Sequence, residues 1–450
     1  MKRLLKGGRV VDPVNGIDGV HDVLIDGDRI AAVGRDLPVN GASVVEIPQG
    51  LVVCPGFIDM HVHLREPGQE HKETVATGTA AAVAGGFTAV ACMPNTDPIN
   101  DQASVTELVL RRAAEAGLAR VYPIGAVSRG SRGEQMADIG ELHAAGCVAI
   151  SDDGRPVASA LLMRRALEYA GMFGMPVIDH CEDQSLKGDG VAHEGHQASV
   201  LGLRGIPSAA EEIMVERDVT LAGLTGCAVH IAHMSVRGSL RAVREGKARG
   251  VPVTCEVAPH HFTLTDEALA GIRGAGAPGP PYDTNVKMNP PLREAADRDA
   301  MIQGLADGSI DTIATDHAPH HYDEKEVEFD KAPFGIVGLE TAVALVLDRL
   351  VHAGHIGVSR MVELLSANPA RILRVEGGAL APGARADVTL LAPDLPVIVS
   401  ASRFRSKSKN TPFDGWTLRG GVGATIVGGR IVYVNANAPG AANLLSEAGA

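Results

Sequence analysis

Aromatic residues are scarce in this 450-residue chain, since Phe, Trp and Tyr together make up 3% of it. Apolar residues nevertheless reach 45%, and 53 positions are glycine. A large core must therefore be packed from small and branched aliphatic side chains. This composition favours an α/β architecture with many turns over an aromatic-rich β-sandwich. The length suits one large barrel with a smaller appendage.

Cysteine pairs and long apolar runs are also missing. The six cysteines are widely scattered and form no CxxC motif, so we expect reduced, buried thiols. Residues 1–13 hold only a short apolar stretch, unlike a secretory signal, and no window approaches the roughly 18 apolar residues of a membrane span. These features predict a cytoplasmic protein without a membrane segment.

Positive charge is in deficit. Lys and Arg number 41 against 54 Asp and Glu, which gives a formal net charge of −13. Such a surface repels nucleic acid and anionic membranes, and no dense basic run offsets it. An anionic small-molecule substrate would therefore need local positive charge inside a pocket.

Both ends of the chain have a texture that differs from the middle. Short alternating segments with Gly and Asp-Pro breaks occupy the first fifty residues, and the same style returns in residues 386–400 and 423–435. We predict that the two ends pair into one small β-sandwich. The expected domains are 1–54 and 366–450 for this sandwich, and 55–365 for the region between.

The middle region repeats a short apolar strand, a polar tip and a longer helical segment. Short strands that are apolar throughout are typical of parallel sheets buried on both faces. Eight such units predict a (β/α)₈ barrel, and no GxGxxG motif supports the rival doubly wound sheet. The expected strands are 56–63, 86–95, 120–128, 146–154, 175–183, 228–235, 251–261 and 310–320.

Ionisable residues gather at the carboxyl ends of these strands. In a barrel these ends meet on one face, where barrel active sites lie. Imidazole and carboxylate groups are ligands for Zn²⁺ and similar ions, and the spacing of two in HVH lets both rings reach one ion. The candidate ligands are His61, His63, Asp153, His180, His233 and Asp316.

Each of these residues has a simpler interpretation when taken alone. A histidine at a strand end is more often a hydrogen-bonded structural residue, Asp316 could cap a helix, and the DDG around Asp153 could form a turn. The joint pattern of six metal-type residues at five strand ends favours the metal site.

Several motifs carry a family resemblance. The chain resembles the amidohydrolase superfamily in FIDMHVHLREPG and TDHAPH. It resembles bacterial class I dihydroorotases in HVHLREPG, MPNTDP, DDG, DHCED, HIAHMS, VKMNPPLR, TDHAPH, FGIVGLETA and KSKNTPFDGW. The match runs through essentially the whole chain.

The resemblance implies reversible hydrolysis of (S)-dihydroorotate to N-carbamoyl-L-aspartate in pyrimidine biosynthesis. It implies one or two Zn²⁺ per subunit, with two expected. A metal-activated water would attack the ring, with Asp316 as general acid and base. His61, His63 and Asp316 would hold one ion, His180 and His233 the other, and Asp153 would lie between them.

The substrate carboxylate accounts for Arg65, because a guanidinium can bind it through two hydrogen bonds. The resemblance implies a substrate site of His63, Arg65, Asn95, Asn289, His320, Phe334 and Gly335. Asn95 and Asn289 could also be turn residues beside proline, and His320 a surface residue at a loop entrance. The charged segment 321–333 is either a solvated loop or a mobile flap.

Two rival functions stay open. A hydantoinase or allantoinase would carry a carbamylated lysine at the fourth strand end, where this chain has Asp153. A non-catalytic dihydroorotase-like partner of aspartate carbamoyltransferase would have lost metal ligands, whereas all six are present here. The resemblance implies that the protein is a homo-oligomer, namely a dimer. Whether it associates with aspartate carbamoyltransferase stays open.

Overall fold

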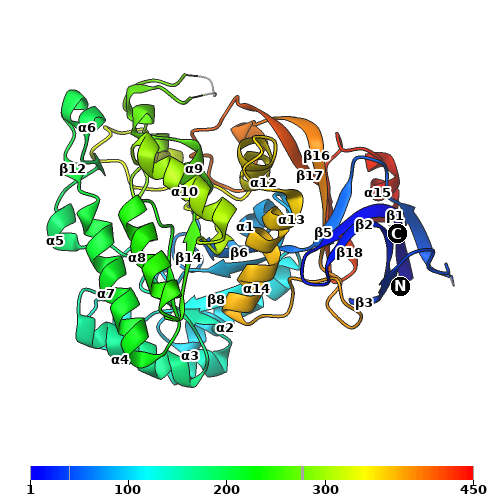
Figure 1. Cartoon of the computed structure of the whole chain (residues 1–450), viewed down its shortest axis with the longest axis horizontal. Coiled ribbons are helices and arrows are strands. Elements are labelled where there is room, and N and C mark those ends of the chain that lie inside the picture. The colour runs from blue at the N-terminus through cyan, green and yellow to red at the C-terminus, as the bar shows by residue number, and fades with distance from the viewer. Residues whose placement is uncertain (1, 40, 275–277, 449–450) are drawn as a thin grey trace.

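Eight short parallel strands form the barrel sheet of the computed structural model, which describes residues 2–39, 41–274 and 278–448 (Figure 1). They follow one another in chain order and pair as parallel neighbours, and a bridge between Val62 and His317 joins the last unit to the first. The predicted barrel is therefore confirmed. The strands are β6 (Phe57–Val62), β7 (Phe87–Cys92), β8 (Arg120–Gly125), β9 (Ala149–Ile150), β10 (Val177–Asp179), β13 (Val229–Ile231), β14 (Val253–Val257) and β15 (Thr312–Ile313).

Alternate positions along these strands belong to two different apolar clusters. Val90 and Val177 pack with residues of the surrounding helices. Ala89, Ala91 and Ile178 pack with residues of other strands, so they fill the interior of the barrel. Alanines dominate this inner cluster, and the narrow interior explains how the core is filled with so few aromatic side chains.

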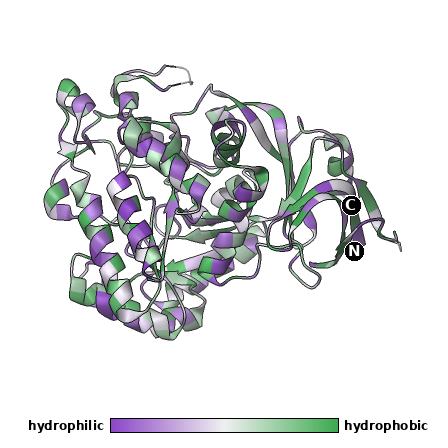
Figure 2. Ribbon diagram, viewed as in Figure 1, coloured by the Kyte–Doolittle hydropathy of each residue, from purple (hydrophilic) through white to green (hydrophobic). Residues whose placement is uncertain are grey.

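Helices cover the outside of the barrel, with polar residues facing outward and apolar residues facing the strands (Figure 2). Ser159 begins one of them by accepting a hydrogen bond from Leu162 N. The longer ones are α1 (Val75–Ala84), α2 (Ala103–Ala116), α3 (Ile139–Ala145), α4 (Ala160–Met172), α7 (Ala209–Thr225), α8 (Arg237–Ala248) and α10 (Ala295–Asp307). Short elements between them are α5 (Gln184–Lys187), α6 (His196–Leu201), α9 (Pro259–Thr263), α11 (Tyr322–Lys325), α12 (Ala342–Val346), α13 (Val358–Val362) and α14 (Asn368–Leu373).

The two ends of the chain form a second sheet at one side of the barrel, where both termini lie (Figure 1). Its eight strands curve around a separate apolar core, and antiparallel pairing of β5 with β16 joins the N-terminal and C-terminal parts. The strands are β1 (Lys2–Asp12), β2 (Ile17–Asp26), β3 (Arg29–Gly34), β4 (Ser43–Glu46), β5 (Val52–Pro55), β16 (Val388–Ile398), β17 (Thr417–Val427) and β18 (Arg430–Val434). The exact domain boundaries stay a prediction.

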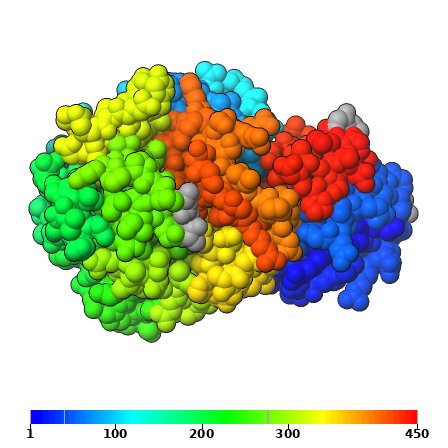
Figure 3. Space-filling view, turned by 90° about the horizontal axis from the view of Figure 1, so that it is seen from above, coloured from blue at the N-terminus to red at the C-terminus, as the bar shows by residue number. Residues whose placement is uncertain are grey.

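Contacts with α1 and with the turn after it fix the terminal sheet against the barrel. Thr389 Oγ1 on β16 donates to Gly86 O at 2.7 Å, and Thr425 Oγ1 on β17 donates to Val83 O at 2.7 Å. In Figure 3 the orange part of the chain lies between the green part of the barrel and the red and blue terminal sheet. Within the described residues, no helix has the length and hydropathy needed to cross a membrane.

Two features were not predicted. The two-residue strands β11 (Ala192–His193) and β12 (Gly205–Ile206) form a small ribbon between β10 and α7, and α15 (Ala441–Ala448) packs beside β18.

Candidate metal centre and active site

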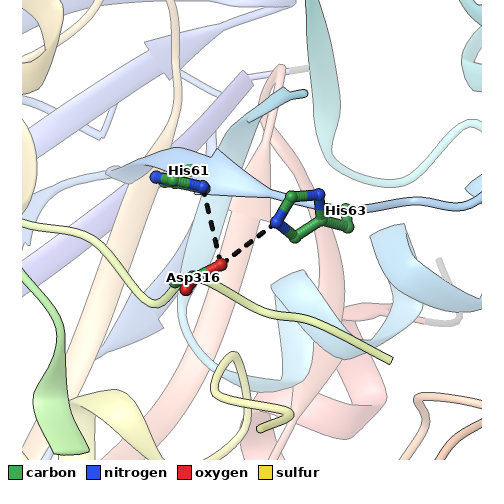
Figure 4. A group of neighbouring side chains, drawn as sticks. All are labelled: His61, His63 and Asp316. Carbon is green, nitrogen blue, oxygen red and sulfur yellow. Dashed lines mark hydrogen bonds and ion pairs between the residues drawn. The ribbon is translucent and has the colours of Figure 1, made fainter. Parts of the chain in front are cut away.

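The first three candidate ligands meet at the carboxyl end of the barrel. His61 and His63 extend from β6 toward Asp316, which follows β15 (Figure 4). Asp316 Oδ1 lies 3.1 Å from His63 Nε2 and 3.5 Å from His61 Nε2. All three side chains are buried, and one atom of each can face a common point.

Asp153 brings the remaining ligands to the same place. Its Oδ1 lies 3.4 Å from His61 Nε2, 3.6 Å from His180 Nδ1 and 3.5 Å from His233 Nε2. Its Oδ2 lies 3.5 Å from His63 Nε2. The structure therefore brings all six predicted ligands together, with Asp153 in the position between the two groups.

Three residues at this end of the barrel have left-handed backbone conformations, which side chains other than glycine rarely adopt. The φ angles are +60° at Arg65, +30° at His233 and +46° at Asp316. Such conformations cost roughly 1–3 kcal/mol each and persist where the surrounding structure enforces them. Their coincidence with the ligands and the anion-binding candidate indicates that the backbone is shaped to aim these side chains.

The unpaired polar atoms of the cluster fit a metal ion. His61 Nε2 and Asp153 Oδ1 are buried without a hydrogen-bond partner among the described residues, although both face the common point. Burial opposes protonation of His180, but Asp153 and Glu182 raise its pKa to about 10. An imidazole that neighbouring carboxylates keep protonated against burial is suited to bind a cation instead, with release of that proton.

Glu256 is a functional carboxylate that the sequence analysis missed. It lies on β14, where its Oε1 accepts hydrogen bonds from His61 Nδ1 at 2.7 Å and from His233 N at 3.2 Å. His230 Nε2 donates to its other oxygen at 3.1 Å. Burial opposes the charge, but His61 and His230 lower the pKa of Glu256 to about 2. Glu256 therefore fixes the ring of His61 with Nε2 turned toward the common point.

We expect Glu256→Gln to weaken metal binding by about 10–100-fold, because a carboxylate behind a metal-binding imidazole fixes its orientation and basicity. The measurement is metal affinity by competition with a chromogenic chelator. Glu216→Gln, at an exposed carboxylate on α7, is the matched control. Unchanged affinity in Glu256→Gln would contradict the orienting role.

A cavity of about 320 Å³ is lined by five of the six predicted ligands. Every residue that the sequence analysis predicted for substrate binding lines it: His63, Arg65, Asn95, Asn289, His320, Phe334 and Gly335. They come from loops after β6, β7 and β15 and from the segment before α10. The roles of these residues stay predictions, but their convergence on one cavity is observed.

Arg65, Asn95 and His320 are three of the residues that line this cavity. Arg65 Nε donates to Pro319 O at 3.2 Å, and burial lowers the pKa of this guanidinium to about 10, so it remains a cation at neutral pH. Asn95 Oδ1 accepts from His63 Nδ1 at 2.8 Å. Burial and the charge of Arg65 hold the pKa of His320 far below its usual range, and its neutral ring donates Nε2–H to Phe334 O at 2.8 Å.

Lys187 and Glu182 also belong to the cavity region and were not predicted. Lys187 lines the cavity and its Nζ bonds Glu182 Oε2 at 2.8 Å. Asn289 Nδ2 donates to the same oxygen at 3.2 Å, which leaves Asn289 Oδ1 buried without a partner in the described structure. The DHCED motif was the available signal, since Glu182 lies two residues beyond His180.

Comparison with known proteins identifies relatives of this chain. A family model described as dihydro-orotase-like matches residues 50–239. A protein named dihydroorotase from Pelotomaculum thermopropionicum is 56% identical over 96% of this chain and 98% of its own length. Its counterpart from Geobacter metallireducens is 51% identical over 96% of this chain and 100% of its own length.

The chain belongs to the dihydroorotase family. The resemblance found in the motifs is thereby confirmed over nearly the full length of the chain. Dihydroorotases are amidohydrolases, and two solved amidohydrolase structures share the fold of this family member. L-hydantoinase from Arthrobacter aurescens has a TM-score of 0.83 at 24% identity, covering 97% of this chain and 98% of its own. Dihydropyrimidinase from Brevibacillus agri has a TM-score of 0.81 at 23% identity, covering 99% and 97%.

Proposed function

We propose that this chain catalyses the reversible hydrolysis of (S)-dihydroorotate to N-carbamoyl-L-aspartate, a step of pyrimidine biosynthesis. The observation that carries the proposal is the placement of Arg65 in a cavity lined by five of the six metal-type residues, all six of which are buried. A cyclic amide that bears a carboxylate needs both parts, one to hold the carboxylate and the other to open the ring. Membership of the dihydroorotase family supports the same reaction.

The proposed cofactor is Zn²⁺, with two ions per subunit. His61, His63 and Asp316 would hold one, His180 and His233 the other, and Asp153 would contact both, as their mutual distances of 2.8–3.6 Å allow. When bound, zinc would lower the pKa of a water molecule toward neutrality and polarise the amide carbonyl.

Asp316 is the proposed proton carrier. Its carboxylate lies beside His61 and His63 and lines the cavity. It can therefore take a proton from the attacking water and deliver it to the departing ring nitrogen. Burial would raise its pKa, but His61 and His63 hold that pKa below its ordinary value. The free carboxylate is therefore ionised and ready to act as a base.

The remaining lining residues would bind the substrate. Arg65 and Asn95 would hold the carboxylate, and His320 would join them by turning its single N–H away from Phe334 O. Asn289 Oδ1, which has no partner in the described structure, can accept a hydrogen bond from a ring N–H. Backbone groups of Phe334 and Gly335, which also line the cavity, would contact the substrate ring.

One preparation can test the reaction against its nearest rival. We expect turnover of dihydroorotate and none of hydantoin, because Asp153 replaces the bridging lysine of hydantoinases and Arg65 selects for a carboxylate. The measurement is the loss of each cyclic amide by ultraviolet absorbance, with zinc determined on the same sample. Hydantoin turnover would favour the rival, and a metal-free, inactive protein would favour a non-catalytic partner.

A further inference from the structure

Two chain segments contribute residues to the wall of the cavity. One is the 283–289 segment, which carries Asn289, and the other is the 321–335 loop, which carries Phe334 and Gly335. The loop is rich in charge, so its sequence allows either a solvated loop or a mobile flap. Two buried lysines make its contacts with the 283–289 segment.

Lys325 lies in the loop and is only 5% exposed. Its ammonium group donates to Thr284 O at 3.0 Å and to Pro333 O at 2.8 Å. Thr284 Oγ1 returns a hydrogen bond to Lys325 O at 2.6 Å. One lysine thus ties the start of the loop both to its end and to the 283–289 segment.

Lys287 makes the reciprocal connection from the other segment and is 2% exposed. Its ammonium group donates to Phe329 O at 2.7 Å and to Asp330 O at 3.0 Å, and its own carbonyl accepts from Gly335 N at 2.9 Å. The same ammonium lies 4.8 Å from the centre of the Phe334 ring, within range of a cation–π contact.

Burial of these two ammonium groups carries a desolvation cost. Burial lowers the pKa of Lys325 to about 7 and that of Lys287 to about 8. Within the described ranges neither forms an ion pair with a carboxylate, so their hydrogen bonds go to backbone carbonyls. An apolar side chain would fill the same space without that desolvation cost. The cation is useful because it can bind several carbonyls of an irregular loop at once.

We infer that Lys287 and Lys325 are positioning residues that hold the 321–335 loop as a fixed wall of the substrate cavity before substrate arrives. Through the loop they place Phe334 and Gly335, and through the 283–289 segment they place Asn289. The ring of Phe334 is within range of two cations, Lys287 and also Lys187, whose Nζ is 5.2 Å from the ring centre. The inference concerning catalysis rests on the proposed function, whereas the fixed loop itself does not.

Kinetics test the positioning role. In Lys287→Met and Lys325→Met the carbonyl bonds are lost while the side-chain length is kept. We expect KM for dihydroorotate to rise about tenfold or more with kcat within about threefold, because the misplaced groups contact the substrate throughout the reaction. Lys325→Arg, which retains a cationic donor, should recover part of the loss. Lys331→Met is the matched control, since this loop lysine is 66% exposed.

A glutamate-specific protease tests the fixed loop without any substrate. Glu324, Glu326 and Glu328 all lie in the loop. Lys287→Met leaves the sequence around all three unchanged, and Lys325→Met alters the immediate neighbours of Glu324 and Glu326 only, so cleavage after Glu328 is the site to compare. We expect slow cleavage in the wild type and in Lys331→Met, and cleavage at least about tenfold faster in the two variants, because local opening controls proteolysis. If the protein had no dihydroorotase activity, this result would still decide whether Lys287 and Lys325 hold the loop in place.

Hydrogen exchange measured on the wild type tests the inference even if a variant does not fold. The amide of Gly335, bonded to Lys287 O, should be protected in the absence of substrate. Full exchange there, with protection only after substrate is added, would show a mobile flap and overturn the inference. Unchanged KM and unchanged cleavage in both folded variants would overturn it as well, and so would an equal loss of kcat and thermal stability with no change in KM.

Discussion

Asp316→Asn is expected to lower kcat by about 10²–10⁴-fold, the range that general acid–base catalysis contributes. Asparagine keeps the shape of the side chain and one oxygen near His61 and His63, 3.5 and 3.1 Å from the present carboxylate. It cannot take or deliver a proton under the reaction conditions. The variant therefore separates the proton-transfer role of Asp316 from its role in holding metal.

The measurement is kcat for dihydroorotate together with the zinc content of the same sample. Asp297→Asn is a suitable control, because Asp297 is also buried but accepts from Arg237 N on the helical side of the barrel. A variant that keeps its zinc and more than about a tenth of the wild-type kcat would contradict the acid–base role. Loss of zinc would instead assign Asp316 mainly to the metal, and Asp316→Glu would then be the variant to examine.

The barrel could be predicted because its strands are marked by composition. Each of the eight is a short apolar run, and buried parallel strands need apolar residues on both faces. The ribbon of β11 and β12 carries no such mark, because its Ala-His and Gly-Ile pairs lie in polar, glycine-rich sequence and not in an apolar run. Helix α15 lies in a region that the terminal β pattern had assigned to the second sheet.

The ligands could be predicted because barrel topology brings strand ends together, whatever their separation in sequence. Glu256 escaped because it lies within the apolar strand VTCEV, where one carboxylate has no neighbour in sequence that indicates its partner. Only the folded barrel shows that it faces His61. The metal site is thus predictable at the level of the ligands, and less so at the level of the residues that orient them.

The 321–335 loop shows a different limit. Its charge pattern is that of a solvated segment, yet Lys325 is almost fully buried within it. The partners of Lys325 and Lys287 are backbone carbonyls, and every residue offers a carbonyl. The pattern of side chains in the sequence therefore cannot predict such a contact, and only the folded structure shows it.

Arg65→Met should raise KM for dihydroorotate by about 30- to several thousand-fold, because truncating a buried charged hydrogen-bond partner costs roughly 2–5 kcal/mol. Arg65 is 8% exposed and lines the cavity. Its only hydrogen bond within the described structure joins Nε to Pro319 O. The terminal amino groups of the guanidinium are thus free of protein partners there and can bind a carboxylate through two bonds.

Arg65→Lys distinguishes charge from geometry. Lysine keeps the positive charge but cannot reproduce the planar pair of donors, so we expect a rise in KM smaller than that of Arg65→Met but still measurable. Zinc content should be unchanged in both variants, since Arg65 is two residues beyond His63 and contacts no predicted ligand through a hydrogen bond. If zinc fell while KM held, Arg65 would support the metal centre and the substrate carboxylate would have to be held elsewhere, with Lys187 as the remaining cation in the cavity lining.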